Sequence, residues 1–123
     1  MTILNRTALI IEDDAKQAEI FSQALILVGF EVQTIADGAE ANTLLDSAAP
    51  DLVLLDLHLP QVSGEKLLRK IRTEAHLANT KVIVTTADAE KAFQLNDDCD
   101  LVLIKPISFN QLRELSARLF QRG

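Results

Sequence analysis

The stretch of sequence that most constrains the fold is a run of four branched apolar residues, Leu52 to Leu55, which ends at Asp56. Because no polar residue alternates with them, they are typical of a strand covered on both faces, as central strands of parallel sheets are. Pro60 and Gly64 then keep the following residues from continuing the strand. The run predicts a central strand of an α/β fold, with Asp56 at the sheet edge where such folds place their ligand sites. Taken alone, Asp56 fits the cap of a turn equally well.

Strand-like and helix-like segments alternate along the rest of the chain. Further strands are expected at residues 7–11, 31–35, 81–86 and 101–104, and helices at 15–28, 37–48, 64–74, 87–96 and from 108 onward. The helices follow from apolar residues at three- and four-residue spacing and from capping residues such as Ser108 before Gln111. Residues 87–96 leave room only for a short helix. Five strands alternating with five helices predict a doubly wound, five-stranded parallel sheet with right-handed crossovers.

Composition excludes several functional classes. A chain of 123 residues with 48% apolar residues fits one folded domain, 1–123. Its 12 Lys and Arg against 18 Asp and Glu give a net charge of −6, which disfavours direct binding to nucleic acid or anionic membranes. No run reaches the ~18 apolar residues of a membrane span, and Cys99 has no partner for an internal disulfide. We therefore expect a cytoplasmic protein.

Charged and hydroxyl side chains follow the predicted strands at the points where the strands end. Since parallel strands finish at the same sheet edge, these side chains should converge there: Glu12, Asp13, Asp56, Thr86 and Lys105. Two carboxylates about 4 Å apart repel by roughly 4 kcal/mol at an effective dielectric near 20, so the cluster requires cations. Lys105 supplies one charge and a divalent metal the second. A donor set of oxygens without His or Cys side chains favours Mg²⁺ or Mn²⁺.

Such a cluster suits phosphate chemistry. An ionised Asp can attack phosphorus to form an acyl phosphate, so Asp56 is expected to be the nucleophile. Lys105 and the metal would neutralise charge on the phosphoryl group, and the Thr86 hydroxyl would donate a hydrogen bond to one of its oxygens.

The spacing of these elements resembles the receiver domain of two-component response regulators. The likeness covers essentially the whole chain and rests on four elements in the correct order: Glu12-Asp13-Asp14, Asp56 with Leu57-His58-Leu59-Pro60 and Gly64, Thr86-Ala87, and Lys105-Pro106. It implies a flavodoxin-like fold with strand order 2-1-3-4-5. It also implies a signalling module rather than an enzyme with turnover, in which phosphoryl transfer and dephosphorylation are self-catalysed and signalling proceeds through protein contacts.

The resemblance further implies specific partners and ligands. The phosphoryl group on Asp56 would come from a histidine kinase or a histidine phosphotransfer protein. Mg²⁺ would be held by Asp13, Asp56 and the backbone carbonyl of His58, with Glu12 reaching it through water. Thr86 and Lys105 would bind the phosphoryl group, and the Lys105-Pro106 peptide bond would be cis, a form that is common only before proline.

Two other functions remain open from the residues. A magnesium-dependent phosphatase of the haloacid dehalogenase type would also use an Asp nucleophile, and His58 occupies the position where such enzymes carry an acid; they usually need extra length for a cap. A pseudo-receiver would only dock on partners, but the intact site residues argue against it. Simpler roles also exist: the acidic residues 12–14 could cap a helix, His76 would lie in an exposed loop, and the basic side of helix 64–74 would be solvated (Lys66, Arg69, Lys70 and Arg72).

One position departs from the resemblance. Receiver domains usually carry Tyr or Phe three residues before the strand-five lysine, whereas this chain has Val102. Valine has a stiff χ1 and no ring that could swing between two positions. We therefore expect signalling by partner exchange near the site, around residues 15–22 and 106–109, in place of dimerisation through the fourth helix, fifth strand and last helix.

Overall fold

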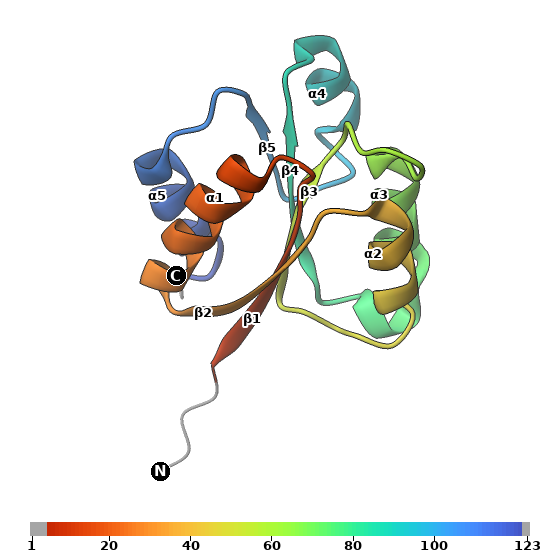
Figure 1. Cartoon of the computed structure of the whole chain (residues 1–123). Coiled ribbons are helices and arrows are strands. Elements are labelled where there is room, and N and C mark those ends of the chain that lie inside the picture. The colour runs from red at the N-terminus through yellow and green to blue at the C-terminus, as the bar shows by residue number, and fades with distance from the viewer. Residues whose placement is uncertain (1–4, 122–123) are drawn as a thin grey trace.

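A computed structural model describes residues 5–121 as one five-stranded parallel sheet in the order β2-β1-β3-β4-β5 (Figure 1). The strands are β1 (Arg6–Ile11), β2 (Phe30–Ile35), β3 (Leu52–Asp56), β4 (Lys81–Thr86) and β5 (Leu101–Ile104). This order confirms the predicted doubly wound sheet. It also places β1 and β3 side by side in the middle, so that their ends meet at the same edge.

Helices cover both faces of this sheet. They are α1 (Ala15–Val28), α2 (Gly38–Leu44), α3 (Gly64–Thr73), α4 (Ala89–Leu95) and α5 (Phe109–Leu119), with one 3₁₀ turn, η1, at Ala75–Leu77. Helices α1 and α5 lie on one face, and α2 and α3 on the other (Figure 1). Leu95 of α4 packs against the core of the α2 and α3 face. Within residues 5–121, no helix has both the length and the apolar character needed to cross a membrane.

The central strand is buried as its sequence predicts. Every residue of β3 is buried, and the strand pairs in parallel with β1 on one side and β4 on the other. Its side chains alternate between two apolar cores, so Val53 and Leu55 face α2 and α3, while Leu52 and Leu54 face α1 and α5. A strand with helices on both sides has no solvated face, which explains the absence of polar alternation.

Side-chain caps set the start of most helices. Asp14 accepts hydrogen bonds from Lys16 N and Gln17 N, both at 3.0 Å, and thereby satisfies two free amides of the first turn of α1. Ser108 accepts from Gln111 N at 3.0 Å, as predicted for the last helix. At the other end of α1, Gly29 has φ 115°, a left-handed conformation that only glycine adopts at little cost.

Helix α2 is shorter than predicted. It ends at Leu44 and not at Ala48. Side chains from α3 and η1 bond to the backbone at this end of the helix. The Lys70 ammonium donates to the carbonyl oxygen of Asn42 at 2.9 Å and forms an ion pair with Asp46. A ring nitrogen of His76, Nε2, contacts the carbonyl oxygen of Leu45 at 2.8 Å. His76 is exposed, as expected, but it lies in the 3₁₀ turn η1 and not in a loop, and it contacts the end of α2.

The basic side of α3 was expected to be solvated, and this expectation is wrong for two of its four residues, Lys70 and Arg72. Arg72 donates from Nε to the carbonyl of Asp98 at 2.7 Å and from its terminal nitrogens to the carbonyl of Thr80 at 3.2 Å and to Asp100 Oδ2 at 2.9 Å. Its guanidinium has several donors in a fixed fork. This one side chain therefore joins α3 to the residue before β4 and to the loop before β5. Lys66 and Arg69 are exposed as predicted.

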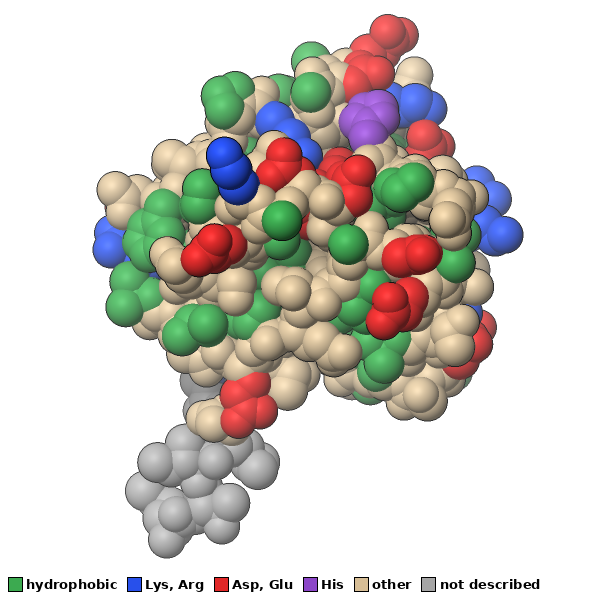
Figure 2. Space-filling view, in the orientation of Figure 1, with side chains coloured by type: hydrophobic (Ala, Val, Ile, Leu, Met, Phe, Trp, Pro, Cys, Tyr) green, Lys and Arg blue, Asp and Glu red, His purple; other side chains and the backbone are tan. Residues whose placement is uncertain are grey.

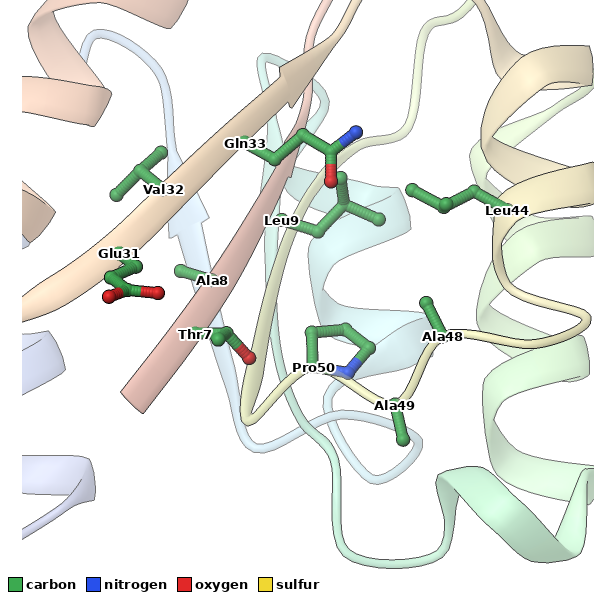
Figure 3. Close-up of a pocket in the computed structure, with 10 residues that line it drawn as sticks. All are labelled: Thr7, Ala8, Leu9, Glu31, Val32, Gln33, Leu44, Ala48, Ala49 and Pro50. Carbon is green, nitrogen blue, oxygen red and sulfur yellow. The ribbon is translucent and has the colours of Figure 1, made fainter. Parts of the chain in front are cut away.

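The early end of α2 leaves part of the sheet uncovered. A hollow of about 360 Å³ lies there, between β1, β2 and the segment that leads into β3 (Figure 3). Its lining includes Glu31 and Gln33, which explains why β2 alternates polar and apolar residues more than the other strands do. The hollow lies near the beginnings of β1 and β3, away from the edge where the strands end.

Candidate functional site

Charged side chains gather over the edge where the strands end. Figure 2 shows acidic and basic side chains side by side at the top of the molecule, which is the end that β1 points to in Figure 1. The residues at that edge come from four separate segments: Glu12 and Asp13 after β1, Asp56 at the end of β3, Thr86 at the end of β4 and Lys105 after β5. The structure therefore gathers at one edge the residues that the sequence singled out.

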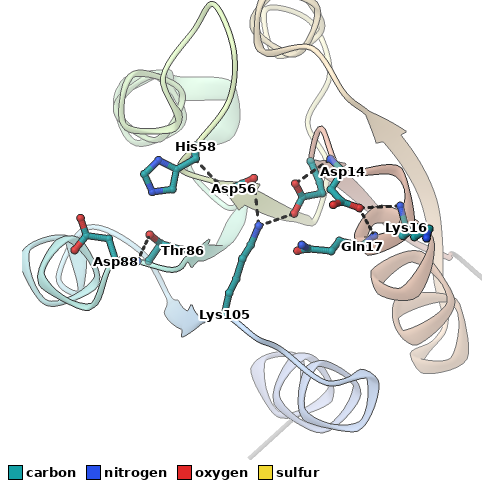
Figure 4. Close-up of polar contacts among 9 residues, drawn as sticks. Asp14, Lys16, Gln17, Asp56, His58, Thr86, Asp88 and Lys105 are labelled. Atoms are coloured by element: carbon teal, nitrogen blue, oxygen red, sulfur yellow. Dashed lines mark hydrogen bonds and ion pairs between the residues drawn. The ribbon is translucent and has the colours of Figure 1, made fainter.

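Asp56 is a buried carboxylate with fixed partners. Its side chain is 3% exposed, and its two oxygens have different donors (Figure 4). The backbone amide of His58 donates to Oδ1 at 3.0 Å, and the Lys105 ammonium lies 3.4 Å from Oδ2. Each carboxylate oxygen has two lone pairs, so both retain room for another ligand. The His58 ring points away from Asp56, and only its backbone takes part (Figure 4).

The loop after β3 is kept tight by a glycine. A Cβ atom added to Gly64 would lie 2.6 Å from the carbonyl oxygen of Asp56 and 2.6 Å from Leu57 Cα. No side chain fits at those distances without moving the backbone. Gly64 N also donates to the carbonyl of Leu57 at 3.3 Å. The start of α3 is therefore fixed to the strand that carries Asp56.

Glu12, Asp13 and Asp56 form the acidic cluster that the sequence predicts. One carboxylate oxygen from each lies within 4.8 Å of the others, with Asp13 exposed and the other two buried. Burial, followed by a hydrogen bond shared with Asp56, raises the pKa of Glu12 to about 7, while the hydrogen bond from Lys105 acts in the opposite direction. Glu12 is 3% exposed and so is no solvated cap; Asp14 alone caps α1.

Lys105 connects the acidic cluster to the end of β4. Its ammonium donates to Glu12 Oε1 at 3.0 Å as well as contacting Asp56. Burial acts to lower its pKa, but the hydrogen bond to Glu12 and the charge of Asp56 outweigh burial, and the pKa is raised. Its backbone amide donates to the carbonyl of Thr86 at 2.8 Å. The following Lys105-Pro106 peptide bond is cis, as expected.

The Thr86 side chain is fully buried, and its hydroxyl contacts the start of α4; its bond to a phosphoryl oxygen stays a prediction. The hydroxyl accepts a hydrogen bond from the backbone amide of Asp88 at 3.0 Å (Figure 4). Asp88 in turn caps α4 by accepting from the amides of Glu90 and Lys91. The hydrogen bonds of residues 5–121 include none between Thr86 Oγ1 and Asp56. Sequence reasoning missed Asp88, although an Asp directly before an expected helix is a recognisable capping signal.

The donor set of this site fits a hard divalent cation. It consists of carboxylate oxygens, and neither nitrogen nor sulfur side-chain donors contribute to the described cluster. Lys105 pairs with Glu12 and Asp56, so the cluster of three carboxylates holds more negative than positive charge even after this lysine is counted. A cation with a preference for oxygen ligands would remove this imbalance.

Comparison with known proteins agrees with this geometry. Residues 8–117 match the response regulator receiver domain. The chain belongs to this family. As a receiver domain, it is a signalling module of two-component systems with the flavodoxin-like fold.

Three proteins illustrate the similarity of this receiver domain to its relatives. The DNA-binding response regulator MtrA of Mycobacterium tuberculosis is 31% identical over 99% of this chain and 52% of its own length. The phosphate regulon transcriptional regulatory protein PhoB of Rhizobium meliloti is 34% identical over 93% of the chain and 52% of its own length. The chain therefore spans about half the length of these curated relatives.

The third relative is a solved structure. The response regulator TrrA of Thermotoga maritima, in complex with Mg²⁺ and BeF, is 28% identical, with a TM-score of 0.82, over 94% of this chain and 99% of that protein.

Proposed function

We propose that Asp56 accepts a phosphoryl group from the phosphohistidine of a histidine kinase or a histidine phosphotransfer protein. The observation that carries this proposal is the position of Asp56: a buried carboxylate at the end of the central strand, held by the His58 amide and the Lys105 ammonium. An oxygen of Asp56 attacks phosphorus, the bond from phosphorus to the donor imidazole breaks, and its electron pair returns to the imidazole nitrogen.

The metal in this reaction is Mg²⁺, with Mn²⁺ as a substitute of similar chemistry. Asp13 and Asp56 would hold it together with the backbone carbonyl of His58, and Glu12 would reach it through water. The three carboxylates within 4.8 Å of one another support this assignment. When bound, a divalent cation offsets negative charge on the phosphoryl oxygens and on the carboxylates.

The remaining site residues stabilise the product. Lys105 already contacts Asp56 and can pair with a phosphoryl oxygen on it without a large movement. Thr86 must turn its hydroxyl away from the Asp88 amide to donate to the phosphoryl group. The same residues support self-catalysed transfer and dephosphorylation in a protein that is not an enzyme with turnover. In the rival phosphatase mechanism His58 would act as an acid, but its ring points away from Asp56 (Figure 4).

A partner surface adjoins the site. A hollow of about 390 Å³ lies beside it, lined by Gln17, Ile20, Phe21, Lys105, Pro106 and Ile107. Ile20 is 44% exposed, so apolar area is available next to the phosphoacceptor. Apart from Lys105, the lining of this hollow belongs to the segments 15–22 and 106–109, where partner exchange is expected. With a net charge of −6, the domain would act through protein contacts in the cytoplasm, without binding nucleic acid or membrane directly.

The test is phosphorylation by a small phosphodonor with Mg²⁺. Wild type should gain one acid-stable, hydroxylamine-labile phosphoryl group, and Asp56→Asn should gain none because the nucleophile is removed while the fold is kept. Asp97→Asn, at an exposed position after α4, is the matched control and should be labelled like wild type. Labelling of Asp56→Asn at the wild-type rate would show that the site is wrong. Continuous turnover of the donor would favour the phosphatase mechanism, and no reaction at all would favour a pseudo-receiver.

A further inference from the structure

Helix α4 has little apolar anchorage. Of its seven residues only Ala92 is buried, and the largest apolar side chain, Phe93, is 86% exposed. Leu95 packs against the core from a half-buried position. Burial of apolar area is the main force that fixes a helix on a sheet, so the position of α4 must depend strongly on its polar contacts.

The two ends of α4 are held by different contacts. Beyond its C-terminal end, Arg72 binds the carbonyl of Asp98 and the carboxylate of Asp100, which ties the following loop to α3. At its N-terminal end, Lys91 of the first turn forms an ion pair with Glu65 of α3, and the Asp88 amide donates a hydrogen bond to the Thr86 hydroxyl. In the proposed function this hydroxyl turns to the phosphoryl group, which removes that bond. The N-terminal end of α4 is therefore the end that can move.

One ion pair opposes such a movement. The ammonium of Lys91, in the first turn of α4, lies 2.9 Å from Glu65 Oε1 in the first turn of α3. The hydrogen bond and charge of Glu65 raise the pKa of Lys91, so its ammonium keeps its charge at neutral pH. Glu65 follows Gly64, which is fixed to the strand of Asp56 by its close contacts. The ion pair thus joins α4 to a helix whose first residue packs closely on the strand of Asp56.

The space between the two helices is consistent with this arrangement. A cleft of about 160 Å³ lies between α3 and α4, lined by Glu65, Leu68, Arg69, Arg72, Leu95 and Asp98. The lining is mostly charged, so the helices are not joined by close apolar packing along their length. Opening or closing this cleft would cost little apolar contact.

We propose that the Lys91–Glu65 ion pair is a latch that holds α4 in its unphosphorylated position and must break when the domain is phosphorylated. The inference rests on the proposed function, because it requires the Thr86 hydroxyl to leave Asp88. With the latch open, α4 swings about the end that Arg72 holds and carries the exposed Phe93 with it. Val102 has no ring that could take part in this movement, and in this proposal the ion pair controls it.

If the latch exists, a variant without the Lys91–Glu65 ion pair should bind a phosphate mimic more tightly than wild type. If the ion pair opposes the phosphorylated state, its loss must favour any ligand that selects that state. Mg²⁺ with beryllofluoride is the probe, and binding is measured by calorimetry because the chain has no Trp or Tyr for fluorescence. Lys91→Met and Glu65→Gln should each bind about two- to fivefold more tightly than wild type, the range expected for an exposed ion pair.

Two controls make the test specific to the pair. The double variant Glu65→Lys/Lys91→Glu reverses the two charges and should restore affinity toward the wild-type value. Lys66→Met removes an exposed lysine next to Glu65 and should bind like wild type. The difference between wild type and Lys91→Met should also shrink in 0.5 M salt, because salt screens exposed pairs.

Each outcome has a defined meaning. Single variants that bind like wild type, or more weakly, would overturn the latch, as would a charge-reversed double variant that binds as tightly as the single ones. If wild type failed to bind beryllofluoride with Mg²⁺, the proposed function itself would be overturned and the latch with it. Tighter binding by both single variants, reversed in the double variant, is the expected result.

Discussion

Helices α1 and α4 flank the same edge of the sheet but are attached to it by different forces. Helix α1 buries Ala18, Phe21, Ala24 and Leu25 and packs along α5, whereas α4 buries Ala92 alone. Lys105 joins the carboxylates of Glu12 and Asp56 beside α1, while the Thr86 hydroxyl beside α4 accepts a hydrogen bond from the amide of the helix cap. The site therefore has a firmly packed side and a loosely attached side.

This difference separates two tasks within one small domain. The firmly packed side holds the carboxylates close together in spite of their repulsion, which requires a rigid frame. The loosely attached side can change position for a small free energy, and regions that move in signalling generally have low local stability. Four predictions test the contrast, beginning with the largest expected effect.

The first compares the apolar anchorage of the two helices. Leu25→Ala should lower the free energy of unfolding by about 3 kcal/mol, because a fully buried side chain is lost and a cavity remains. Phe93→Ala should change it by less than about 0.5 kcal/mol, because that ring is exposed. Urea unfolding followed by circular dichroism measures both. Equal losses in the two variants would contradict the contrast.

The second concerns the pH dependence that the packed carboxylates impose. Glu12 has an ordinary pKa of 4.5 in the unfolded chain and about 7 in the folded metal-free protein. Between these values the folded state binds more protons, so its stability should decrease as pH rises from 4.5 to 7, by on the order of 2 kcal/mol, and level off above.

Glu12→Gln is the variant that tests this dependence. In this variant the free energy of unfolding should depend less on pH, because the titrating group is gone. Glu19→Gln, on the exposed side of α1, should leave the pH dependence unchanged. The measurement is the midpoint of urea unfolding at each pH in this range, with EDTA present to keep the protein free of metal. A wild-type curve that rises with pH in this window would refute the assignment.

The third prediction concerns the metal. In the proposed function Mg²⁺ binds the folded cluster and not the unfolded chain, so at ten times its Kd it should stabilise the protein by about 1.4 kcal/mol and raise the Tm by several degrees. Asp13→Ala should lose most of this shift. Lys91→Met, on the loosely attached side, should retain it. Thermal melts with and without Mg²⁺ distinguish the two, and an intact shift in Asp13→Ala would count against the metal site.

The fourth and smallest effect uses the single cysteine as a probe. Cys99 lies just after α4, and burial raises the pKa of its thiol to about 11. At pH 8 it should react with iodoacetamide roughly tenfold or more slowly than in the unfolded chain. Lys91→Met should raise the rate about twofold as α4 opens more often. Rates that are the same in both folded proteins would indicate that α4 is held by something other than the ion pair.

Much of the fold could be predicted from the sequence because local signals and the global fold agree. The uninterrupted apolar run at residues 52–55 required a buried central strand, and the short segment at 87–96 required a short fourth helix. The length of α2 could not be predicted, because it ends where Lys70 and His76, far along the chain, supply its last carbonyl oxygens with donors.

The residues of the site were also predictable, whereas several of their contacts were not. Convergence of strand ends follows from a parallel sheet, so Asp56, Glu12 and Lys105 could be grouped without coordinates. The bond between Thr86 and the Asp88 amide depends on a side-chain rotamer, which the sequence does not determine. The exposed pair of Lys91 and Glu65 depends on how two helices cross, which is likewise beyond a pattern of apolar spacing.

The hydrogen bonds of Arg72 limit which residues can replace it on the surface of α3. Its three acceptors lie in two segments, at Thr80 before β4 and at Asp98 and Asp100 in the loop before β5, and a lysine, with one nitrogen at its tip, could not reach them together. A position that looks like an ordinary solvent-facing site should therefore tolerate substitution as poorly as a core position. In a library of random variants, replacements at Arg72 should be depleted among functional clones, while replacements at neighbouring Arg69 should be accepted freely.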